Sequence, residues 1–400
     1  MTQPPTPSRP WLTRNLKIVS LVSLLQDAAS ELLYPLLPIL LTTVLGAPAA
    51  VVGAVEGVAE GVAAVTKIVA GRFSDRWRKV PLVGLGYGLA AVGKVLVAAA
   101  SVWPVVLLGR SVDRLGKGIR GAPRDSLLVV GIAPEHRGRA FGFHRAADTA
   151  GAVIGPLLAL VGYELLDHRI QPLLWVAVVP AVLSAGLVHA LREPSVAPVA
   201  PVVPVAVPPS VTAAAPLGRP FWQVVGVLGV FSLVNFPDAL LLLRLHDIGF
   251  SVVQVILAYV GYNLVYTLIS YPAGVVADRL SAQHVVAVGL LVFAVVYAGL
   301  GLTESHLAAW LLMAGYGAYT GLTDGVGKAW VSRLLPRESQ GTGQGLFQGV
   351  LGGGVLVAGV WAGLAWGGDG HLPLVVAGAV AGVVGAALLV VRLPAAHWPA

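Results

Sequence analysis

The sequence predicts an all-α membrane protein of about twelve transmembrane helices in two pseudo-symmetric six-helix halves. Three observations predict this class: the composition is strongly apolar, the apolar residues form long blocks, and short motifs recur at a constant spacing. Of the 400 residues, 56% are hydrophobic and only 11% are charged. Soluble domains carry roughly 25% charged residues, so this chain has too few to cover an aqueous surface.

The apolar blocks are about twenty residues long or longer, the length that an α-helix needs to cross roughly 30 Å of hydrocarbon. They show no strict alternation of apolar and polar residues, which disfavours membrane-spanning strands. The 49 glycines fit helices that pack closely in lipid. The blocks lie at 15–45, 49–70, 80–101, 103–130, 140–166, 171–191, 221–245, 251–274, 284–302, 307–335, 342–366 and 372–392.

Composition also excludes several function classes. The chain has no cysteine, which excludes disulfides, thiolate catalysis and Cys-based zinc sites. It has no Walker lysine motif, and no second ligand is spaced to join His144 at a metal. The net charge of +7 comes without a basic block interleaved with aromatic residues, so nucleic acid is not an expected partner. We expect neither an enzyme nor a metal or cofactor site.

The basic residues predict the orientation in the lipid bilayer. Arg9, Arg14 and Lys17 precede the first apolar block, which is too long for a signal peptide and is interpreted as a retained helix. Basic residues then recur at alternate connections, whereas the opposite connections hold almost none beyond Arg169. The positive-inside rule therefore predicts that both termini are cytoplasmic.

The segment 192–219 divides the chain. It carries seven prolines among valine and alanine. Because proline removes a backbone donor and breaks a helix, we interpret this segment as an extended cytoplasmic linker. It separates a predicted six-helix bundle at 1–191 from a second one at 220–400, and we expect the protein to be a monomer.

Two short motifs recur in the second half at an offset of 203 residues (274 − 71 = 203). One is a glycine followed four residues later by Asp-Arg, and the other is a pair of glycines four residues apart. Two matches at one offset predict an internal repeat, which is common among secondary transporters. The residues are Gly71, Asp75 and Arg76 with Gly274, Asp278 and Arg279, and Gly138 and Gly142 with Gly341 and Gly345.

These motifs resemble those of the major facilitator superfamily, and the resemblance covers nearly the whole chain. The family's loop signature between helices 2 and 3 is G-x-x-x-D-R-x-G-R-[RK]. The first Asp-Arg copy matches it up to the basic pair Arg78-Lys79, without the glycine after Asp-Arg-x, and the second copy lacks the basic tail. In the family this loop latches one conformation of the two domains, so the resemblance implies that role for both copies.

Two further motifs of the family match this chain. An arginine in helix 4 followed by small residues is matched by Arg110 with Gly116 and Gly118. A glycine motif in helix 5 is associated with exporters that exchange substrate for protons. Its residues here are Gly142, Gly151, Gly155 and Pro156, but Ala159-Leu160 replaces the final glycine pair.

The run from Asp113 to Asp125, D-R-L-G-K-G-I-R-G-A-P-R-D, resembles a poorly characterised prokaryotic branch of the superfamily. The resemblance implies the major facilitator fold and a place in the cytoplasmic (inner) membrane of a prokaryote. It says little about the substrate.

Helix 4 carries six charged residues within an arc of about 120°, spread over roughly 21 Å of helix axis. A charge at the centre of a membrane helix costs about 2.5–3.5 kcal/mol even on a lenient insertion scale. The charged stripe must therefore face protein, water or both. Its members are Arg110, Asp113, Arg114, Lys117, Arg120 and Arg124.

Neighbouring helices supply possible counter-charges, and the sequence leaves open which acid meets which base. One interpretation is that all these groups form structural ion pairs. The other is that some line a central cavity and bind substrate or protons, a place that the family architecture implies for helices 1 and 4. The candidates are Asp27, Glu31, Glu56, Glu60, Lys67, Lys94, Arg145 and Asp148.

The second half has fewer charges inside its apolar blocks. Asp324 and Lys328 lie one turn apart on helix 10, which is most simply a local salt bridge. Substrate contact is the alternative for this pair and for the polar residues of helices 7 and 8. Those residues are Asn235, Asp238, Tyr262 and Asn263.

The sequence therefore favours a secondary transporter that works by alternating access, through proton-coupled export of a small polar or anionic organic solute. The excess of bases in helix 4 supports an anionic or hydrogen-bonding substrate. The alternative is a facilitator or importer in which the intramembrane charges are structural ion pairs. The expected partners are the lipid bilayer, the solute and protons.

Overall fold

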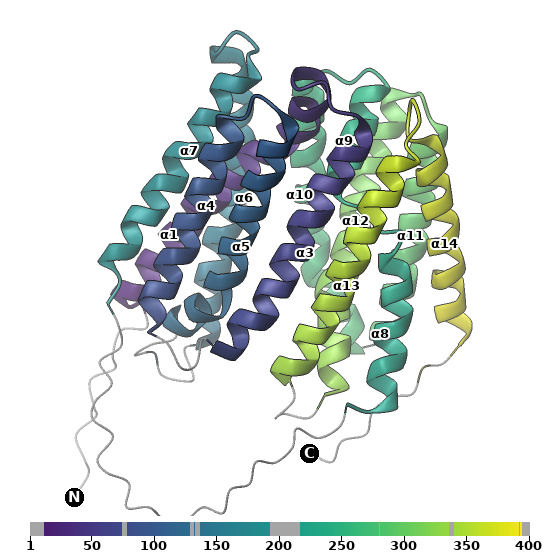
Figure 1. Cartoon of the computed structure of the whole chain (residues 1–400). Coiled ribbons are helices and arrows are strands. Elements are labelled where there is room, and N and C mark those ends of the chain that lie inside the picture. Colours follow the sequence, from purple (N-terminus) through teal and green to yellow (C-terminus); the bar gives the residue numbers. More distant parts are fainter. Residues whose placement is uncertain are drawn as a thin grey trace, which may run out of the picture. The chain divides into compact units, whose positions relative to one another are not determined.

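The computed structural model describes residues 12–73, 78–128, 132, 137–192, 217–279, 281–335, 340–391 and 393 (Figure 1). Within these residues, every element is a helix or a helical turn. The α-helices are α1 (Arg14–Leu33), α2 (Leu37–Ile39), α3 (Ala49–Phe73), α4 (Lys79–Ala98), α5 (Trp103–Leu128), α6 (Arg137–Leu165), α7 (Ile170–Leu187), α8 (Arg219–Ser232), α9 (Asp238–Asp247), α10 (Val252–Arg279), α11 (Ala282–Leu302), α12 (His306–Arg333), α13 (Gln340–Leu364) and α14 (His371–Val390).

Each predicted apolar block coincides with helix in the described part of the chain. Helices α1 and α2 belong to one block, and α8 and α9 to another, so the fourteen α-helices make 14 − 2 = 12 segments. Nine of the described helices are long and apolar enough to cross a membrane. The remaining segments are α5 and α12, which carry charges, and the interrupted α8–α9 pair.

Two segments that the sequence presents as continuous are interrupted. In the first, α1 ends at Leu33 and the chain passes through a 3₁₀ turn at Tyr34–Leu36 into the short α2. In the seventh, α8 ends at Ser232 and α9 begins at Asp238, after a stretch that ends in Pro237. Proline has no backbone donor and fixes its own backbone angle, which favours a break at these places.

The described helices form two compact units. Unit 1 consists of Met1–Leu33, Val69–Ala100 and Leu108–Val202, and unit 2 consists of Tyr34–Ile68, Ser101–Leu107 and Val203–Ala400. Most of α3 therefore packs in unit 2, although it precedes the proline-rich segment. The division into bundles at 1–191 and 220–400 stays a prediction, and the interior of the 192–219 linker lies outside the described residues.

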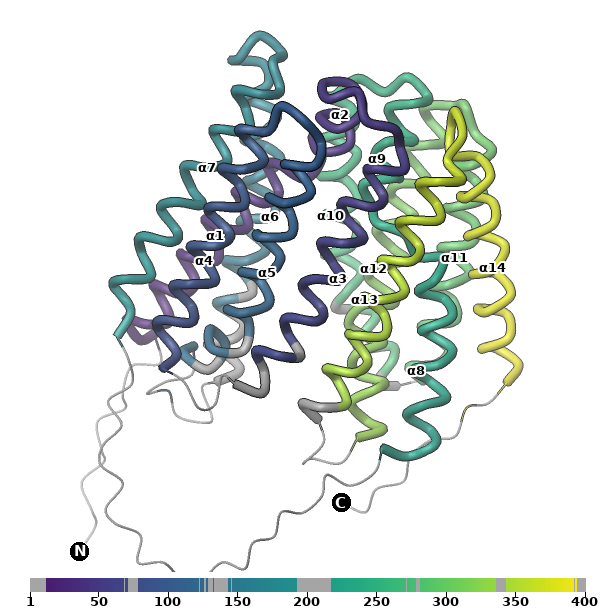
Figure 2. The backbone as a smooth tube through the Cα atoms, in the orientation of Figure 1, coloured from purple at the N-terminus to yellow at the C-terminus, as the bar shows by residue number. Residues whose placement is uncertain are grey.

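In unit 1, α4 and α5 lie side by side (Figure 2). The two helices cross through pairs of glycines spaced seven residues apart. A Cβ on Gly86 would meet the carbonyl oxygen of Gly116 at 2.7 Å, and a Cβ on Gly93 would meet that of Gly109 at 2.5 Å. Small residues let backbones come this close in membrane helices. The next residues along α4, Tyr87 and Lys94, are thereby held against the charged stripe of α5.

The α1–α6 contact of unit 1 depends on two glycines of the helix 5 motif. A Cβ on Gly151 would collide with the carbonyl of Leu24 and lie 3.1 Å from the Cβ of Asp27. A Cβ on Gly155 would lie 2.5 Å from the carbonyl oxygen of Ala28 and 2.9 Å from the Cβ of Glu31. The two glycines therefore set how closely α6 approaches the acidic face of α1.

Replacing Gly151 with alanine is expected to lower the free energy of unfolding by about 1–3 kcal/mol, because an added methyl group forces apart two packed backbones. Gly88→Ala is the matched control, since a Cβ at Gly88 of α4 has nothing within 4 Å. Thermal unfolding of both variants in detergent measures the difference. Equal transition temperatures for the two variants would show that the α1–α6 contact is not tight at this point.

In unit 2, glycines again set the helix contacts. A Cβ on Gly53 of α3 would collide with the carbonyl of Gly359 of α13. On α12, a Cβ on Gly317 would collide with the carbonyl of Tyr262, and one on Gly321 would lie 3.1 Å from the carbonyl oxygen of Tyr266. The close approach of α10 to α12 positions Tyr262 beside Asp238 and Tyr266 beside Asp324.

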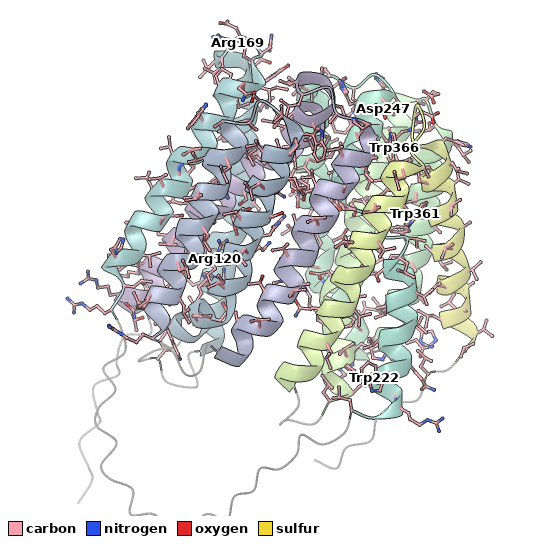
Figure 3. The ribbon with its side chains drawn as sticks, in the orientation of Figure 1. Arg120, Arg169, Trp222, Asp247, Trp361 and Trp366 are labelled. Atoms are coloured by element: carbon pink, nitrogen blue, oxygen red, sulfur yellow. The ribbon has the colours of Figure 1, made fainter. Side chains whose placement is uncertain are left out.

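One end of unit 2 is tied together by a buried arginine. Arg244 of α9 is 1% exposed and donates to the carbonyl oxygens of Leu300 at 3.0 Å, Thr303 at 2.9 Å and Asp369 at 3.0 Å. At the same end, the Trp366 indole donates to the Asp247 carboxylate at 3.0 Å (Figure 3). These bonds join α9 to the α11–α12 and α13–α14 connections.

Candidate functional site

The break between α8 and α9 is built by hydrogen bonds from other helices. The indole of Trp361 on α13 donates to the carbonyl oxygen of Leu233 at 2.7 Å, and the Tyr297 hydroxyl on α11 donates to that of Phe236 at 3.5 Å. Backbone groups freed by a helix break within a membrane need such partners. The break is therefore stabilised by these side chains, and Asp238 lies in the first turn of the helix that follows it, α9.

Both carboxylate oxygens of Asp238 accept tyrosine hydroxyls. Tyr316 of α12 donates to Oδ1 at 2.5 Å, and Tyr262 of α10 donates to Oδ2 at 2.9 Å. The amino-terminal end of α9 adds a favourable dipole for a negative charge. The carboxylate is thus oriented from three helices, while each oxygen keeps a second lone pair.

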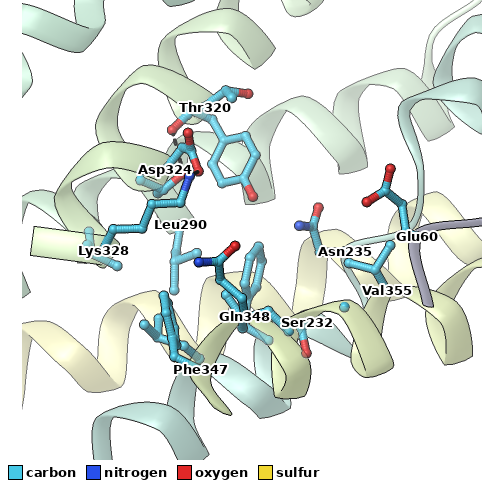
Figure 4. Close-up of a pocket in the computed structure, with 18 of the residues that line it drawn as sticks. Glu60, Ser232, Asn235, Leu290, Thr320, Asp324, Lys328, Phe347, Gln348 and Val355 are labelled. Carbon is cyan, nitrogen blue, oxygen red and sulfur yellow. Dashed lines mark hydrogen bonds and ion pairs between the residues drawn. The ribbon is translucent and has the colours of Figure 1, made fainter. Parts of the chain in front are cut away.

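Asp238 lines a cavity of about 380 Å³ inside unit 2. Figure 4 shows part of the lining of this cavity, including Glu60, Asn235 and Gln348. An adjoining cavity of about 260 Å³ shares Glu60, Asn235, Asp238 and Val355 with it. The larger cavity has an apolar and aromatic wall, which Leu228, Phe231, Leu290, Tyr319 and Phe347 form. Ligand sites are typically apolar cavities with a few polar groups that orient the ligand.

A salt bridge lies on another wall of the larger cavity. Lys328 Nζ lies 2.6 Å from Asp324 Oδ1, and the Tyr266 hydroxyl donates to Asp324 Oδ2 at 3.0 Å. In Figure 4 this pair lies on the opposite side of the cavity from Glu60 and Asn235. Both side chains are partly exposed, so the pair is a local ion pair that also borders the cavity.

Unit 1 contains a second polar site, a buried ion cluster. Lys94 Nζ lies 3.0 Å from Asp113 Oδ1, and Arg110 Nη1 lies 3.6 Å from Asp113 Oδ2. Each of these three side chains is at most 6% exposed. Charges in low dielectric need such partners, and Arg110 and Asp113 of the α5 stripe are accordingly buried with Lys94 of α4.

The members of the stripe towards the carboxyl-terminal end of α5 contact other residues of unit 1. The Arg120 guanidinium lies 4.3 Å from the centre of the Tyr87 ring. The Tyr87 hydroxyl hydrogen bonds to Ser23 Oγ at 3.0 Å, and Arg124 Nη1 donates to the same atom at 3.4 Å. This network links α5 and α4 to α1.

An acidic pair lies between α1 and α6. The side chains of Asp27 and Asp148 lie next to each other, and Lys117 and Arg120 carry positive charges near Asp27. Two ionised carboxylates at this place would repel each other, so a proton on one of them would stabilise the pair. The glycines Gly151 and Gly155 bring the two helices together beside this pair.

The structure separates the predicted candidates into two groups. Asp27, Asp148, Arg110, Asp113 and Arg114 lie in unit 1, whereas the helix 2 acids lie with the second-half residues in unit 2. The helix 2 acids are Glu56, which is 1% exposed, and Glu60.

Other candidates are exposed, bond within their own helix or lie outside the described side chains. Lys117 is exposed, and Asn263 donates to the carbonyl oxygen of Tyr259 in its own helix at 2.9 Å. Several predicted residues lie outside the described part of the chain, namely Asp75 and Arg76. The structure also does not describe the side chains of Arg145, Asp278 and Arg279 or the surroundings of Gly71 and Gly142.

Sequence reasoning selected Asp238, Tyr262 and Lys94 as candidates, but it did not select Tyr316 and Tyr297. Tyr316 and Tyr297 are aromatic residues within apolar blocks, where packing is the ordinary interpretation. Lys94 did carry a signal, since it is a lone lysine in the block 80–101. Among the described residues, no group of three or more His, Cys, Asp or Glu is placed to hold a metal ion.

Comparisons with known proteins give one consistent picture. A family model described as the Major Facilitator Superfamily matches residues 19–243 and 236–400. An uncharacterised MFS-type transporter of Methanocaldococcus jannaschii is 29% identical over 363 residues, 89% of each chain. The multidrug resistance protein MdtH of Yersinia enterocolitica is 31% identical over 155 residues, which are 39% of this chain and 38% of that protein.

Solved structures match over nearly the full length. A variant of the nucleoside transporter NupG has a TM-score of 0.79 and 15% identity, with 94% of this chain and 99% of that chain covered. A variant of the peptide transporter POT has a TM-score of 0.78 and 13% identity, with 96% of both chains covered. At these identities the likeness concerns the fold alone.

Proposed function

Because this chain belongs to the major facilitator superfamily and is a multi-pass membrane transporter, we propose that it exports a small organic solute in exchange for protons. The predicted family and fold are confirmed by these matches, and the chain is a secondary transporter rather than an enzyme. The observation that carries the proposal is the cavity of unit 2, with the Asp238 carboxylate at the α8–α9 break.

The cavity supports binding of a solute with polar groups. Its aromatic wall accommodates an apolar body, while Asp238, Asn235 and Gln348 offer hydrogen-bonding groups. Discontinuous helices commonly provide substrate sites in secondary transporters, because helix ends and freed backbone groups face the ligand there. We propose that the solute binds in this cavity and that alternating access exposes it to each side in turn.

The acidic pair of unit 1 supports proton coupling. Asp27 and Asp148 lie next to each other, so a proton shared by their carboxyl groups would relieve the repulsion between them, and Lys117 and Arg120 lie near the same pair. Loss of the proton would place two negative charges together, which favours separation of α1 and α6 or a closer approach of the bases. Protonation is thereby linked to the helix contact that Gly151 and Gly155 form.

Export and orientation are proposals of the same kind. The helix 5 glycines that pack on α1 are those associated with exchange of substrate for protons, and the multidrug resistance protein MdtH shares partial similarity. Both termini are proposed to be cytoplasmic, in the inner membrane of a prokaryote, with the protein acting as a monomer.

Transport in proteoliposomes tests the proposal. Radiolabelled probes, namely a nucleoside, a dipeptide, an aromatic carboxylate and a quaternary ammonium ion, are offered under an imposed pH gradient. We expect at least one probe to accumulate with the gradient and to be released when a protonophore collapses it. Equilibration of a probe regardless of the gradient would instead support a facilitator, in which the buried charges are structural.

The Asp27→Asn and Asp148→Asn variants are each expected to lose the pH-gradient dependence of accumulation, because an amide cannot gain or lose the shared proton. Exchange of the probe between the two sides should persist. Asp167→Asn is the control, since that side chain is 89% exposed in the α6–α7 connection. If both variants accumulate the probe as the unmodified protein does, the proton-coupling site lies elsewhere.

A further inference from the structure

The charge of the unit 2 cavity differs from that of the α5 stripe. The two adjoining cavities are lined by the acids Glu56, Glu60, Asp238 and Asp324 and by the bases Lys67 and Lys328. Their formal charges sum to −4 + 2 = −2. The cavity is therefore acidic, although the chain as a whole has a net charge of +7.

The acidic surplus lies at the end of the cavity near the α8–α9 break. Lys328 is matched by Asp324 at 2.6 Å, so this base does not neutralise the opposite wall. Glu60 and Asp238 border both cavities. The partners of Asp238 are two neutral tyrosine hydroxyls, which orient its charge without cancelling it.

The walls around these acids are aromatic. Tyr316 and Tyr319 border the larger cavity, with their ring centres 5.5 Å apart. Tyr34 borders the smaller one. Aromatic faces attract organic cations, and desolvation strengthens the attraction. An apolar body carrying one positive group fits such a surface better than an anion does.

We propose that the unit 2 cavity binds a protonated organic amine, with its ammonium group between Asp238 and Glu60 and its apolar body against the aromatic wall. This inference rests on the proposed transport function and names the substrate class for the same site. It differs from the anionic solute favoured by the bases of helix 4, because the structure places those bases in unit 1, with Asp113 as a partner of Lys94 and Arg110.

Calorimetric titration of the purified protein in detergent at pH 7 tests the proposal. Three probes share a phenyl body: 2-phenylethylammonium, the neutral 2-phenylethanol and the anionic 3-phenylpropanoate. We expect the ammonium probe to bind at least tenfold more tightly than the other two. Equal binding of the three probes, or preference for the anion, would overturn the proposal. If ammonium binding is lost when sodium replaces potassium at constant ionic strength, the site binds an inorganic cation and the proposal is wrong.

Variants locate the binding group. Asp238→Asn is expected to raise the Kd of 2-phenylethylammonium at least tenfold, and Glu60→Gln to raise it severalfold. Glu164→Gln, at a side chain that is 57% exposed on α6, is the matched control and should not change it. An unchanged Kd in both cavity variants would place the amine elsewhere and overturn the proposal.

Two further readouts separate a binding role from a structural one. Tyr262→Phe removes a hydrogen bond to Asp238 but keeps its charge, so its Kd should rise much less than that of Asp238→Asn; an equal rise would overturn the charge-based proposal. Ammonium binding without gradient-driven transport in proteoliposomes would contradict the proposed function while supporting this inference. Gradient-driven transport without ammonium binding would do the reverse.

Discussion

Replacing Lys94 with methionine is expected to lower the free energy of unfolding by about 3–5 kcal/mol, because it leaves the buried Asp113 carboxylate without its nearest cation. The two charged atoms lie 3.0 Å apart, and both side chains are nearly inaccessible to solvent. Arg110 at 3.6 Å remains as a longer partner and does not replace the lost contact. Thermal unfolding of the purified protein in detergent measures the change.

The double variant Lys94→Met/Asp113→Asn separates the charge effect from lost packing. We expect it to be less destabilised than the sum of the two single variants, since it removes both charges together. Lys17→Met, at an exposed lysine near the beginning of α1, is the matched control and should change stability little. Strict additivity of the two single variants would mean that Lys94 and Asp113 do not form an energetically coupled pair.

Replacing Arg244 with methionine is expected to lower the free energy of unfolding by about 3 kcal/mol, taking about 1 kcal/mol for each of three carbonyl acceptors that lose their donor. The guanidinium also lies 3.0 Å from the Glu304 carboxylate, but that side chain is 74% exposed and adds little. The loss should first loosen the end of unit 2 where the α11–α12 and α13–α14 connections meet α9.

Hydrogen exchange of the backbone amides around these connections, together with thermal unfolding, measures the Arg244 effect. Arg244→Lys should recover only part of the stability, because one ammonium group cannot reach all the acceptors that the planar guanidinium spans. Arg169→Met is the control, since Arg169 is 67% exposed. Unchanged exchange in the Arg244→Met protein would show that the connections are held by other contacts.

The helical architecture was predictable because it depends on local properties. Block length and hydropathy locate every membrane segment of the described residues to within a few residues, since a helix in lipid must satisfy its backbone internally. The α5 stripe was expected to face protein, water or both, because so many charges cannot face hydrocarbon. Arg110, Asp113 and Arg120 are buried in protein, whereas Lys117 is exposed. The motif resemblance correctly indicated the superfamily.

The partners of the charges were not predictable, because helix packing decides them. Lys94 contacts Asp113 only because the paired glycines let α4 cross α5 closely at the level of these two residues. Glu56 and Glu60 are counter-charges by sequence position, but α3 packs against α13 and carries both to the cavity of unit 2. Sequence distance contains no information about such contacts.

By itself, the sequence determined the fold class, the segment boundaries, the family and the presence of ionisable groups in the membrane. Only the tertiary structure decided that these groups form an ion cluster and an acidic pair in unit 1 and an acidic, aromatic cavity in unit 2. The physical reason is that hydrophobic length acts along the chain, whereas the state of a buried charge depends on the groups that other helices place within a few ångströms.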